Sequence, residues 1–419
     1  MHAMTGVAPL SASVCRRRST RGLALPRLEL FGERIPWEVI TLRASGHRRY
    51  VMSGPIHSGA FSDIHVGLRR GDRTSWAVKR VSVAHASGPL QVNQIDYLQR
   101  ERDALRAMGD LEDEVWLDNG DVYLVTSLAA TDCEQLNRRL NHRISMATRR
   151  ELNRHFLEGA AGELARLHQA GFVHRDIKPA NILVAYDGSI RVRDLGFALP
   201  CGPEELKLDR VVGTPCYTAP ETQEQRLSSH ASDVFSLCVC WAEHCLGGGH
   251  SPFYTYLAEG KGFAFDDFFA SRARLVSHDA RGDAGVDWER VPDHGGDRWD
   301  AFYRALKRLD PKLGEKVLLY GLAPDPAHRW PAARLRDYTR TLRQVRVSLT
   351  KPFTMGRVLK GANKLLAQAD MREAVGGEIA LESDPLRKAI VGGLLQYIDQ
   401  SRRARARRVR HTSFRPNGL

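Results

Sequence analysis

Short apolar runs separated by polar turns follow one another from residue 49 to about residue 128, and this pattern predicts strands. Residues 74–81 alternate as a strand, which places Ala77 and Lys79 on the same face. Residues 91–108 interrupt the strands with apolar positions at helical spacing. A lysine on a mostly apolar strand needs an acidic partner, and this helix is the nearest source of one.

Two pairs of short apolar runs are expected to form hairpins. The first pair, 115–117 and 122–125, flanks Asn119-Gly120, a dipeptide that favours a type I′ turn. The second pair, 182–184 and 190–192, flanks a polar turn with a glycine.

Helical periodicity dominates the second half of the chain. Residues 148–170 predict an amphipathic helix that ends at Gly171, and residues 234–246 predict a strongly apolar one. The apolar face of the first helix consists of Leu152, Phe156, Ala160, Leu164 and Leu167. Residues 250–300 are expected to be rich in loops, because glycine, aspartate and histidine cluster there.

Residues 172–181 follow the first of these helices directly and read Phe-Val-His-Arg-Asp-Ile-Lys-Pro-Ala-Asn. Asp176 stands two residues before Lys178 and five before Asn181. A carboxylate can orient a hydroxyl and accept its proton, a lysine can neutralise a moving phosphoryl group, and an amide oxygen can hold a metal ion. The alternative is a charged turn without chemistry.

This stretch resembles the catalytic loop of eukaryotic-type protein kinases, and further motifs occur in that family's order. Residues 194–196 (Asp-Leu-Gly) are similar to the DFG element, with Leu in place of Phe. Residues 219–221 match the APE motif, and residues 76–79 match the VAIK strand. The resemblance implies an α+β, two-lobed fold with a small β-rich N-lobe and a larger helical C-lobe.

The same resemblance divides the chain into three parts. The kinase domain is expected at 49–345, with an N-lobe at 49–128 and a C-lobe at 129–345. Residues 1–48 would be an N-terminal extension, with 1–22 disordered because they show no periodicity. Residues 346–419 would be a helical tail, with helices near 355–369 and 385–402, and an Arg-rich end.

The resemblance also assigns roles within the catalytic loop and beyond it. Asp176 would be the catalytic base, and Lys178 would neutralise charge on the transferred phosphoryl group. Asn181 and Asp194 would bind Mg²⁺.

Lys79, positioned by Glu101, would bind the α and β phosphates of ATP. On the predicted helix, Asp96 and Asp103 are alternative partners for this lysine.

The glycine-rich loop of the family is degraded in this chain. When the loop is aligned on Gly59 and Phe61, its first and third glycine positions hold His57 and Ser62, so only Gly59 remains to cover the phosphates. Thr126 falls at the gatekeeper position behind the adenine, and Leu128 falls at the hinge between the lobes. The remaining expected nucleotide contacts are Ile56, Ile64 and Ala77.

Residues 213–221 resemble the GTPxYxAPE form of the activation segment found in Ser/Thr kinases. Lys178 favours the same class, because tyrosine kinases usually place Ala or Arg in that region of the loop. Thr214 would bridge Asp176 and Lys178, and Asp233 would tie its helix to the catalytic loop or serve as an ordinary N-cap.

Two further pairings concern the C-lobe. Arg329 is expected to pair with Glu221. In the family, the arginine that precedes the catalytic aspartate often binds a phosphate on the activation loop. Residues 197–213 contain no hydroxyl side chain, so the carboxylates expected either to meet Arg175 or to be solvated are Glu204, Glu205 and Asp209.

Composition adds little to the fold but bears on partners. The chain has 419 residues, 42% hydrophobic and 26% charged, which is ordinary for a soluble globular protein. The net charge of +13 is partly terminal, because arginines cluster near residues 16–21 and 402–410. These ends are expected either to be solvated or to contact nucleic acid or an anionic membrane.

The seven cysteines are scattered without metal-ligand spacing, which predicts free thiols in a reducing compartment. No apolar run reaches the roughly 18 residues that a membrane span needs. We therefore expect a cytoplasmic protein, or a bacterial effector injected into a host cell.

The sequence thus predicts a Ser/Thr protein kinase that uses ATP and Mg²⁺ to phosphorylate a protein substrate. One alternative is a pseudokinase that binds ATP as a scaffold, for which the degraded glycine loop is the support. Another is a small-molecule phosphotransferase of related fold, and a third is a nucleic-acid-binding protein that acts through its Arg-rich ends.

Overall fold

The N-terminal part of the molecule is built on one antiparallel sheet. The computed structural model describes residues 14–16, 29–30, 33–34, 40–43, 49–58, 62–69, 75–82, 89–117, 120–140, 146–185, 189–202, 204–246, 253, 265–279 and 281–344. The sheet has seven strands in the order β1-β4-β5-β6-β7-β9-β8. Its strands are β1 (Val14–Arg16), β4 (Ile40–Arg43), β5 (Arg49–Ser58), β6 (Asp63–Arg69), β7 (Ser75–Ser82), β8 (Asp113–Trp116) and β9 (Asp121–Ser127).

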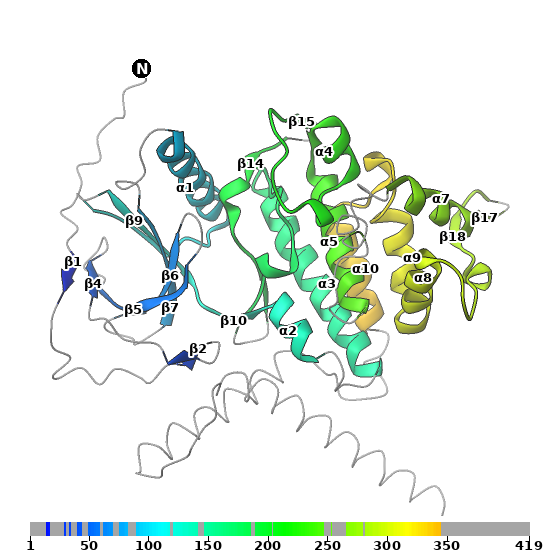
Figure 1. The fold of residues 1–419 in the computed structure, drawn as a ribbon, viewed down its shortest axis with the longest axis horizontal. Helices are drawn as coiled ribbons and strands as arrows, with labels where there is room; N and C mark the ends of the chain where they lie inside the picture. Colours follow the sequence, from blue (N-terminus) through cyan, green and yellow to red (C-terminus); the bar gives the residue numbers. More distant parts are fainter. Residues whose placement is uncertain are drawn as a thin grey trace, which may run out of the picture.

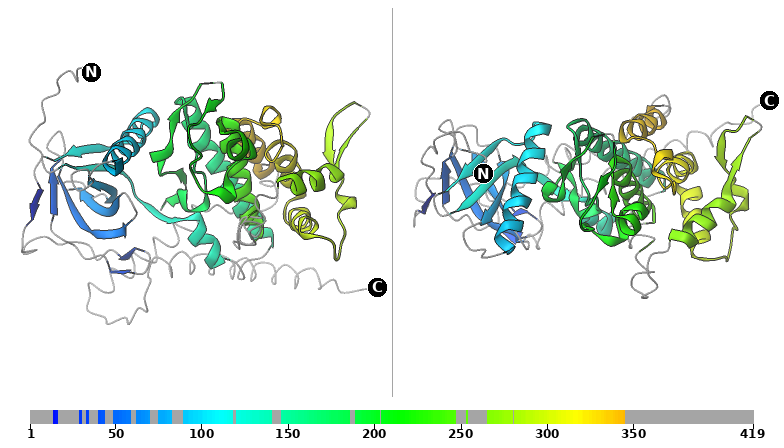
Figure 2. Two further views of the ribbon diagram at one scale, coloured as in Figure 1. Left: turned by 45° about the horizontal axis from the view of Figure 1, so that its top comes forward. Right: turned by 90° about the horizontal axis from the view of Figure 1, so that it is seen from above.

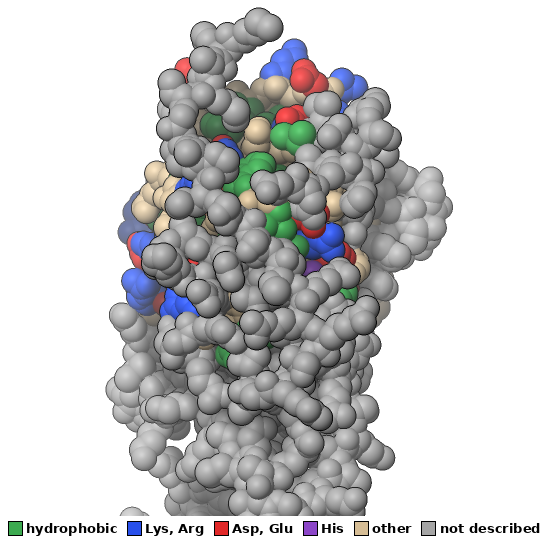
Figure 3. Space-filling model, turned by 90° about the vertical axis from the view of Figure 1, so that its left-hand side faces the viewer, with side chains coloured by type: hydrophobic (Ala, Val, Ile, Leu, Met, Phe, Trp, Pro, Cys, Tyr) green, Lys and Arg blue, Asp and Glu red, His purple; other side chains and the backbone are tan. Residues whose placement is uncertain are grey.

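Helix α1 (Pro89–Met108) lies beside this sheet, on the side that faces the rest of the molecule (Figure 1). The predicted helix at 91–108 and the predicted hairpin around Asn119-Gly120 are both confirmed, the latter as the pair β8 and β9. A view toward the sheet end shows hydrophobic side chains next to charged ones among the coloured residues (Figure 3).

The sheet continues past the expected domain boundary at residue 49. Strand β4 pairs with β5, and β1 in turn pairs with β4. The expectation that residues 1–22 lack regular structure is therefore wrong for Val14–Arg16. The physical reason is that β5 would otherwise be an edge with unpaired backbone groups, which a further strand can satisfy. A separate two-stranded ladder joins β2 (Glu29–Leu30) and β3 (Glu33–Arg34).

The C-terminal part is helical, and α3 (Met146–Gln169) and α5 (His230–Leu246) run through its centre. Helix α10 (Ala332–Gln344) packs along α3, and all three lie side by side in Figures 1 and 2. The predicted apolar face of α3 is buried in one core cluster that reaches from Val66 to Leu335. The other helices are α2 (Cys133–Leu140), α4 (Pro220–Gln225), α7 (Phe265–Leu275), α8 (Arg298–Leu309) and α9 (Pro311–Tyr320).

A small hairpin between the two parts positions the loops that carry the sequence motifs. Strands β12 (Ile182–Ala185) and β13 (Ile190–Val192) pair as predicted, with Ile182 opposite Val192. This register places the residues just outside the hairpin side by side, and the Arg193 amide donates to the Asn181 carbonyl over 3.0 Å. The loop before β12 and the loop after β13 therefore meet at one place.

The remaining short strands connect these loops to their surroundings. They are β10 (Ala129–Asp132) beside β12, β11 (Phe172–Val173) with β14 (Leu199–Pro200), and β15 (Leu206–Lys207) with β16 (Leu227–Ser228). Short 3₁₀ turns occupy Pro179–Asn181 and Leu195–Phe197.

The expectation of a loop-rich stretch over 250–300 is wrong in part. This stretch contains α7 and the pair β17 (Val276–His278) and β18 (Ala284–Val286). Aromatic residues explain the difference, because Phe268 lies 5.4 Å from Phe253 and 5.0 Å from Trp299 between ring centroids. Such clusters bury large apolar surfaces, which the glycine and aspartate content of the stretch does not reveal.

In the part of the chain that the structure describes, no helix is long and apolar enough to cross a membrane. The predicted helices near 355–369 and 385–402, and the Arg-rich end beyond them, lie outside the described residues, as do Gly59 and Phe61.

Candidate active site

The loop before β12 holds three side chains in one hydrogen-bonded set. Lys178 Nζ donates to Asp176 Oδ2 over 2.8 Å and to Thr214 Oγ1 over 3.1 Å, and Thr214 Oγ1 donates to Asp176 Oδ1 over 2.8 Å. The predicted bridge through Thr214 is thus present. Asp176 is buried at 4% exposure, so its carboxylate has a single defined orientation.

Asn181 is fixed against the same carboxylate. Its amide nitrogen donates to the Asp176 carbonyl over 2.8 Å and to Asp176 Oδ2 over 3.1 Å. Because the nitrogen is used by the loop, the amide oxygen is the atom left to contact a cation.

Asp233, in the first turn of α5, anchors the backbone of this loop. Its carboxylate accepts from the His174 amide over 2.7 Å and from the Arg175 amide over 2.9 Å. Burial opposes ionisation, but the hydrogen bond and charge of His168 hold the pKa of Asp233 below its usual value. The tie between helix and loop was predicted. The alternative of an N-cap is excluded, because α5 begins three residues earlier at His230.

The anchor supports a backbone conformation that would otherwise be unfavourable. Arg175 has a φ of 73°, in the left-handed region that side chains other than glycine rarely adopt. Two amide hydrogen bonds to one buried carboxylate offset that cost, so Asp233 sets the shape of the loop that presents Asp176.

A second cluster faces this loop from β7 and α1. Lys79 Nζ lies 2.7 Å from Glu101 Oε2 and 3.1 Å from Asp194 Oδ1. The alternative partners are excluded: Asp96 pairs with Arg100 and Asp103 with Arg102, and both acids are about half exposed. The rotation of α1 therefore brings Glu101 inward.

The charges in this cluster stabilise one another. Burial opposes the charge of Lys79, but the attraction of Glu101 and Asp194 holds its pKa above the ordinary value. Burial likewise opposes ionisation of Asp194, yet Lys79 and a hydrogen bond from Tyr97 lower its pKa to about 2. Both groups are therefore charged at neutral pH.

The register of the sheet aligns most of the expected nucleotide contacts. Ile64 lies opposite Lys79, and Ala77 lies opposite Thr126. Residues directly opposite in antiparallel strands point to the same face, so these four share the face that carries Lys79.

The two remaining described contacts, Ile56 and Leu128, are partly buried against the main core. Asp132 caps α2, because its side chain accepts a hydrogen bond from the Gln135 amide over 2.8 Å.

The activation segment is held by backbone contacts. Arg175 Nη1 donates to the Phe197 carbonyl over 3.3 Å. Within the described residues, no hydrogen bond or ion pair joins Arg175 to Glu204, Glu205 or Asp209, so that hypothesis is wrong. Burial, with the nearby charges of two other arginines, Arg100 and Arg210, lowers the pKa of Arg175 to about 10.

Gly213 lets the end of this segment approach the loop. It has a φ of 98°, and a Cβ at this position would meet the Arg175 carbonyl oxygen. Only glycine combines that backbone with that approach.

The predicted pair between Glu221 and Arg329 is confirmed. Arg329 Nη1 and Nη2 lie 2.7 and 2.9 Å from the two carboxylate oxygens, and both side chains are buried. Such bidentate pairs are geometrically specific, so this one fixes α4 to the turn after α9.

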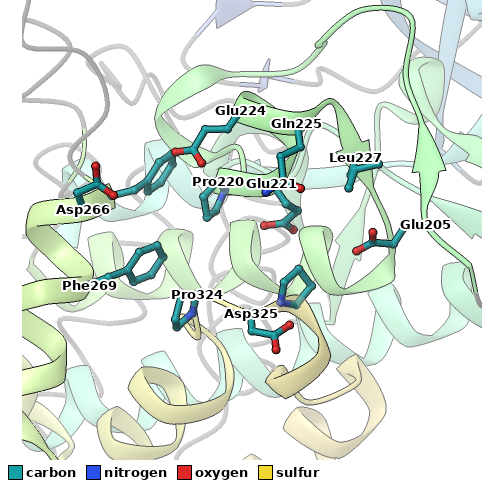
Figure 4. A pocket seen from close by; sticks show the side chains of 12 residues that line it. Glu205, Pro220, Glu221, Glu224, Gln225, Leu227, Asp266, Phe269, Pro324 and Asp325 are labelled. Carbon is teal, nitrogen blue, oxygen red and sulfur yellow. The ribbon is translucent and has the colours of Figure 1, made fainter.

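Beside this pair lies a cavity of about 420 Å³ between α4, α7 and residues 324–326 (Figure 4). Carboxylates and proline rings line much of it, and none of the expected nucleotide contacts does so. It is therefore separate from the site formed by Lys79 and Asp176.

Sequence reasoning missed one residue of the site, Tyr97. Its hydroxyl donates to Asp194 Oδ1, and its ring lies edge-on to Phe197 at 5.6 Å. The signal was available, because Tyr97 stands four residues before Glu101 and therefore on the same face of α1.

The protein-family sequence model described as "Protein kinase domain" matches residues 50–267 of this chain, which is just over half of it. The chain belongs to the protein kinase family.

The chain is also similar to several curated Ser/Thr-protein kinases. A Ser/Thr-protein kinase SMU1 of Mycosarcoma maydis is 28% identical over 55% of this chain and 30% of its own length. The Ser/Thr-protein kinase AfsK of Streptomyces coelicolor is 44% identical over 23% of this chain and 12% of its own. PknL of Mycobacterium tuberculosis is 38% identical over 23% and 24%, respectively.

These relatives are named Ser/Thr kinases and include bacterial proteins. The chain spans less than a third of the length of each of these relatives.

Proposed function

We propose that this protein is a Ser/Thr protein kinase that transfers the γ-phosphoryl group of ATP to protein hydroxyls. The observation that carries the proposal is the hydrogen-bonded set of Asp176, Lys178 and Asn181, which lies in one site with the Lys79–Glu101–Asp194 cluster. A binding module has no need for all of these groups in one arrangement.

In the proposed mechanism, Asp176 accepts a hydrogen bond from the substrate hydroxyl, orients it and takes its proton. Lys178 neutralises charge on the phosphoryl group as it moves, and Thr214 keeps both side chains in place. Little covalent chemistry falls to the protein in phosphoryl transfer, so pre-placed charges supply most of the rate enhancement.

The residues present fit a bound Mg²⁺. The amide oxygen of Asn181 and the carboxylate of Asp194 are hard oxygen donors, the type that Mg²⁺ prefers. The ion would neutralise charge between the phosphates. Lys79 would bind the α and β phosphates, with Glu101 holding it in position, and Gly59 would cover them.

The adenine would lie against the face that carries Ile64, Ala77 and Thr126, with Ile56 and Leu128 at its edges. We further propose that the kinase domain spans 49–345, with α10 packing on α3 at its C-terminal end and with β4 and β1, from the preceding residues, added to its sheet. The Arg-rich ends remain candidates for contact with nucleic acid or an anionic membrane.

The decisive experiment is a radiolabelled-ATP assay with generic protein substrates beside an Asp176→Ala control. Transfer by the wild-type protein and none by the variant supports the proposal. Nucleotide binding without any transfer supports the pseudokinase alternative. Phosphorylation of small molecules alone would identify a phosphotransferase, although those enzymes usually lack an APE motif and its late arginine.

Thr126→Phe tests the placement of the gatekeeper. Thr126 is a small side chain opposite Ala77, so it should leave space behind the adenine for bulky ATP-site inhibitors. The phenyl ring should fill that space and weaken such inhibitors by tenfold or more, about 1.4 kcal/mol.

The measurement is an inhibitor titration against both forms, with ATP affinity as the internal control. Equal inhibitor affinity for the two proteins would contradict the placement of Thr126 at the back of the site.

The activation segment leads to a prediction about regulation. Residues 197–213 contain no hydroxyl side chain that could be phosphorylated, and Arg175 already binds the Phe197 carbonyl. We therefore expect activity without phosphorylation of the loop. Protein made in bacteria and treated with phosphatase should keep most of its activity. If activity is lost and mass spectrometry traces the loss to Thr214 or Thr218, the expectation is wrong.

A further inference from the structure

Tyr97 joins α1 to the segment that carries Asp194. It lies one helical turn before Glu101, and its ring faces the Lys79 ammonium at 5.0 Å from the centroid. The edge of the ring meets Phe197, with an interplanar angle of 88°. Its hydroxyl donates to Asp194 Oδ1.

The packing of the Tyr97 ring against the segment that carries Asp194 requires a glycine at position 196. A Cβ at Gly196 would fall within the Tyr97 ring. The ring therefore lies directly on the backbone at Gly196 and against the side chain of Phe197. This close approach couples the position of α1 to the conformation of the Asp194 segment.

Two donors from different elements meet on one oxygen of Asp194. Lys79 Nζ lies 3.1 Å from Oδ1, and the Tyr97 hydroxyl donates to the same atom. Among the described residues, Asp194 Oδ2 accepts no hydrogen bond, and the side chain is 38% exposed. Oδ1 is thus fixed by the protein, and Oδ2 is the oxygen that remains for a cation.

The Tyr97 hydroxyl is the donor of this bond, because a carboxylate oxygen such as Asp194 Oδ1 can only accept. Asp194 also has a φ of 67°, a left-handed conformation that costs free energy in a residue other than glycine. A directed hydrogen bond to its side chain helps to keep the carboxylate in the orientation that this backbone produces.

We propose that Tyr97 is a positioning residue for Mg²⁺: it holds Asp194 Oδ1 so that Oδ2 faces the metal. The inference rests on the proposed function, because it assigns Asp194 to the metal. Groups that hydrogen-bond to a ligating carboxylate typically contribute 10–100-fold to metal affinity. Losing the Tyr97 hydroxyl should therefore weaken Mg²⁺ binding by about tenfold.

Tyr97→Phe tests this directly, because it removes the hydroxyl and keeps the ring against Lys79, Phe197 and Gly196. We would measure the affinity of a non-hydrolysable ATP analogue by calorimetry at a series of Mg²⁺ concentrations. The variant should need about ten times more Mg²⁺ for half-maximal binding. At saturating Mg²⁺ its affinity should approach that of the wild type.

Tyr50→Phe is the matched control. The Tyr50 hydroxyl also donates to a carboxylate, Asp113 Oδ2, but Tyr50 is fully buried in the sheet and belongs to a different core cluster. Removing this hydroxyl should lower the melting temperature and leave the Mg²⁺ requirement unchanged. If the role of Tyr97 were purely structural, Tyr97→Phe would likewise lower the melting temperature and leave the Mg²⁺ requirement unchanged.

The outcomes separate the inference from the proposed function. If the wild-type protein binds nucleotide with Mg²⁺ dependence and Tyr97→Phe has the same requirement, Tyr97 is not a positioning residue. A lower requirement would also overturn the inference, because it would mean that the hydroxyl competes with the metal. If the wild-type protein shows no Mg²⁺-dependent binding, the proposed function fails and the inference fails with it.

Discussion

Asp194→Asn is expected to abolish phosphoryl transfer while leaving the fold intact. The substitution keeps the shape of the side chain but removes the charge that would hold Mg²⁺ between the phosphates. The Asp194 carboxylate contacts Lys79 and Tyr97 and takes no part in the hydrophobic core. We expect a loss of about 10³-fold or more, the order seen when a charge acting on the transferred group is removed.

The measurement is turnover in the radiolabelled-ATP assay, with circular dichroism and melting temperature to establish folding. Asp337→Asn is a suitable control, because Asp337 is an exposed acid on α10 that pairs with its neighbour Arg336. That variant should keep wild-type activity. Wild-type turnover by a folded Asp194→Asn protein would exclude Asp194 as the metal ligand.

Lys79→Met should lower turnover by orders of magnitude. Lys79 is largely buried between Glu101 and Asp194, and the substitution leaves two carboxylates facing each other without their shared cation. The phosphates would then lose a positive contact and meet additional negative charge. Glu101→Gln should act in the same direction but less severely, because Lys79 keeps its charge and its contact with Asp194.

Two neighbouring acids on α1 provide matched controls for Glu101. Asp96 and Asp103 pair with adjacent arginines at the surface, and such exposed pairs contribute little. Asp96→Asn and Asp103→Asn should therefore leave steady-state kinetics nearly unchanged. If either variant lowered activity as much as Glu101→Gln does, the orientation of α1 that turns Glu101 toward Lys79 would not be the orientation in the active enzyme.

Local sequence patterns predicted a large part of the secondary structure and the grouping of residues in the catalytic loop. The apolar periodicity of 148–170 predicted α3, and the hairpin signals predicted the pairs β8–β9 and β12–β13. The spacing within 172–181 predicted that Asp176, Lys178 and Asn181 act together, and the structure joins them by hydrogen bonds. These predictions succeed because they depend on contacts between residues close together along the chain.

Other features depended on how elements pack at long range. The sequence left three acids open as partners of Lys79, and only the rotation of α1 against β7 selected Glu101. The Tyr97 contact to Asp194 spans 97 positions along the chain and arises from the same packing. No spacing rule covers such pairs, because side chains on separate elements meet only once the elements are placed.

The N-terminal boundary of the sheet and the partners of Arg175 likewise could not be predicted from local sequence patterns. Strands β1 and β4 extend the sheet because the edge of β5 is free to pair, which the weak pattern of residues 1–48 did not reveal. Charge alone suggested that carboxylates would meet Arg175, whereas the folded segment gives it the Phe197 carbonyl. The sequence by itself thus determined the elements and the chemistry of the catalytic loop. The tertiary structure decided which distant groups complete the site, because burial and geometry select one partner from several with suitable charge.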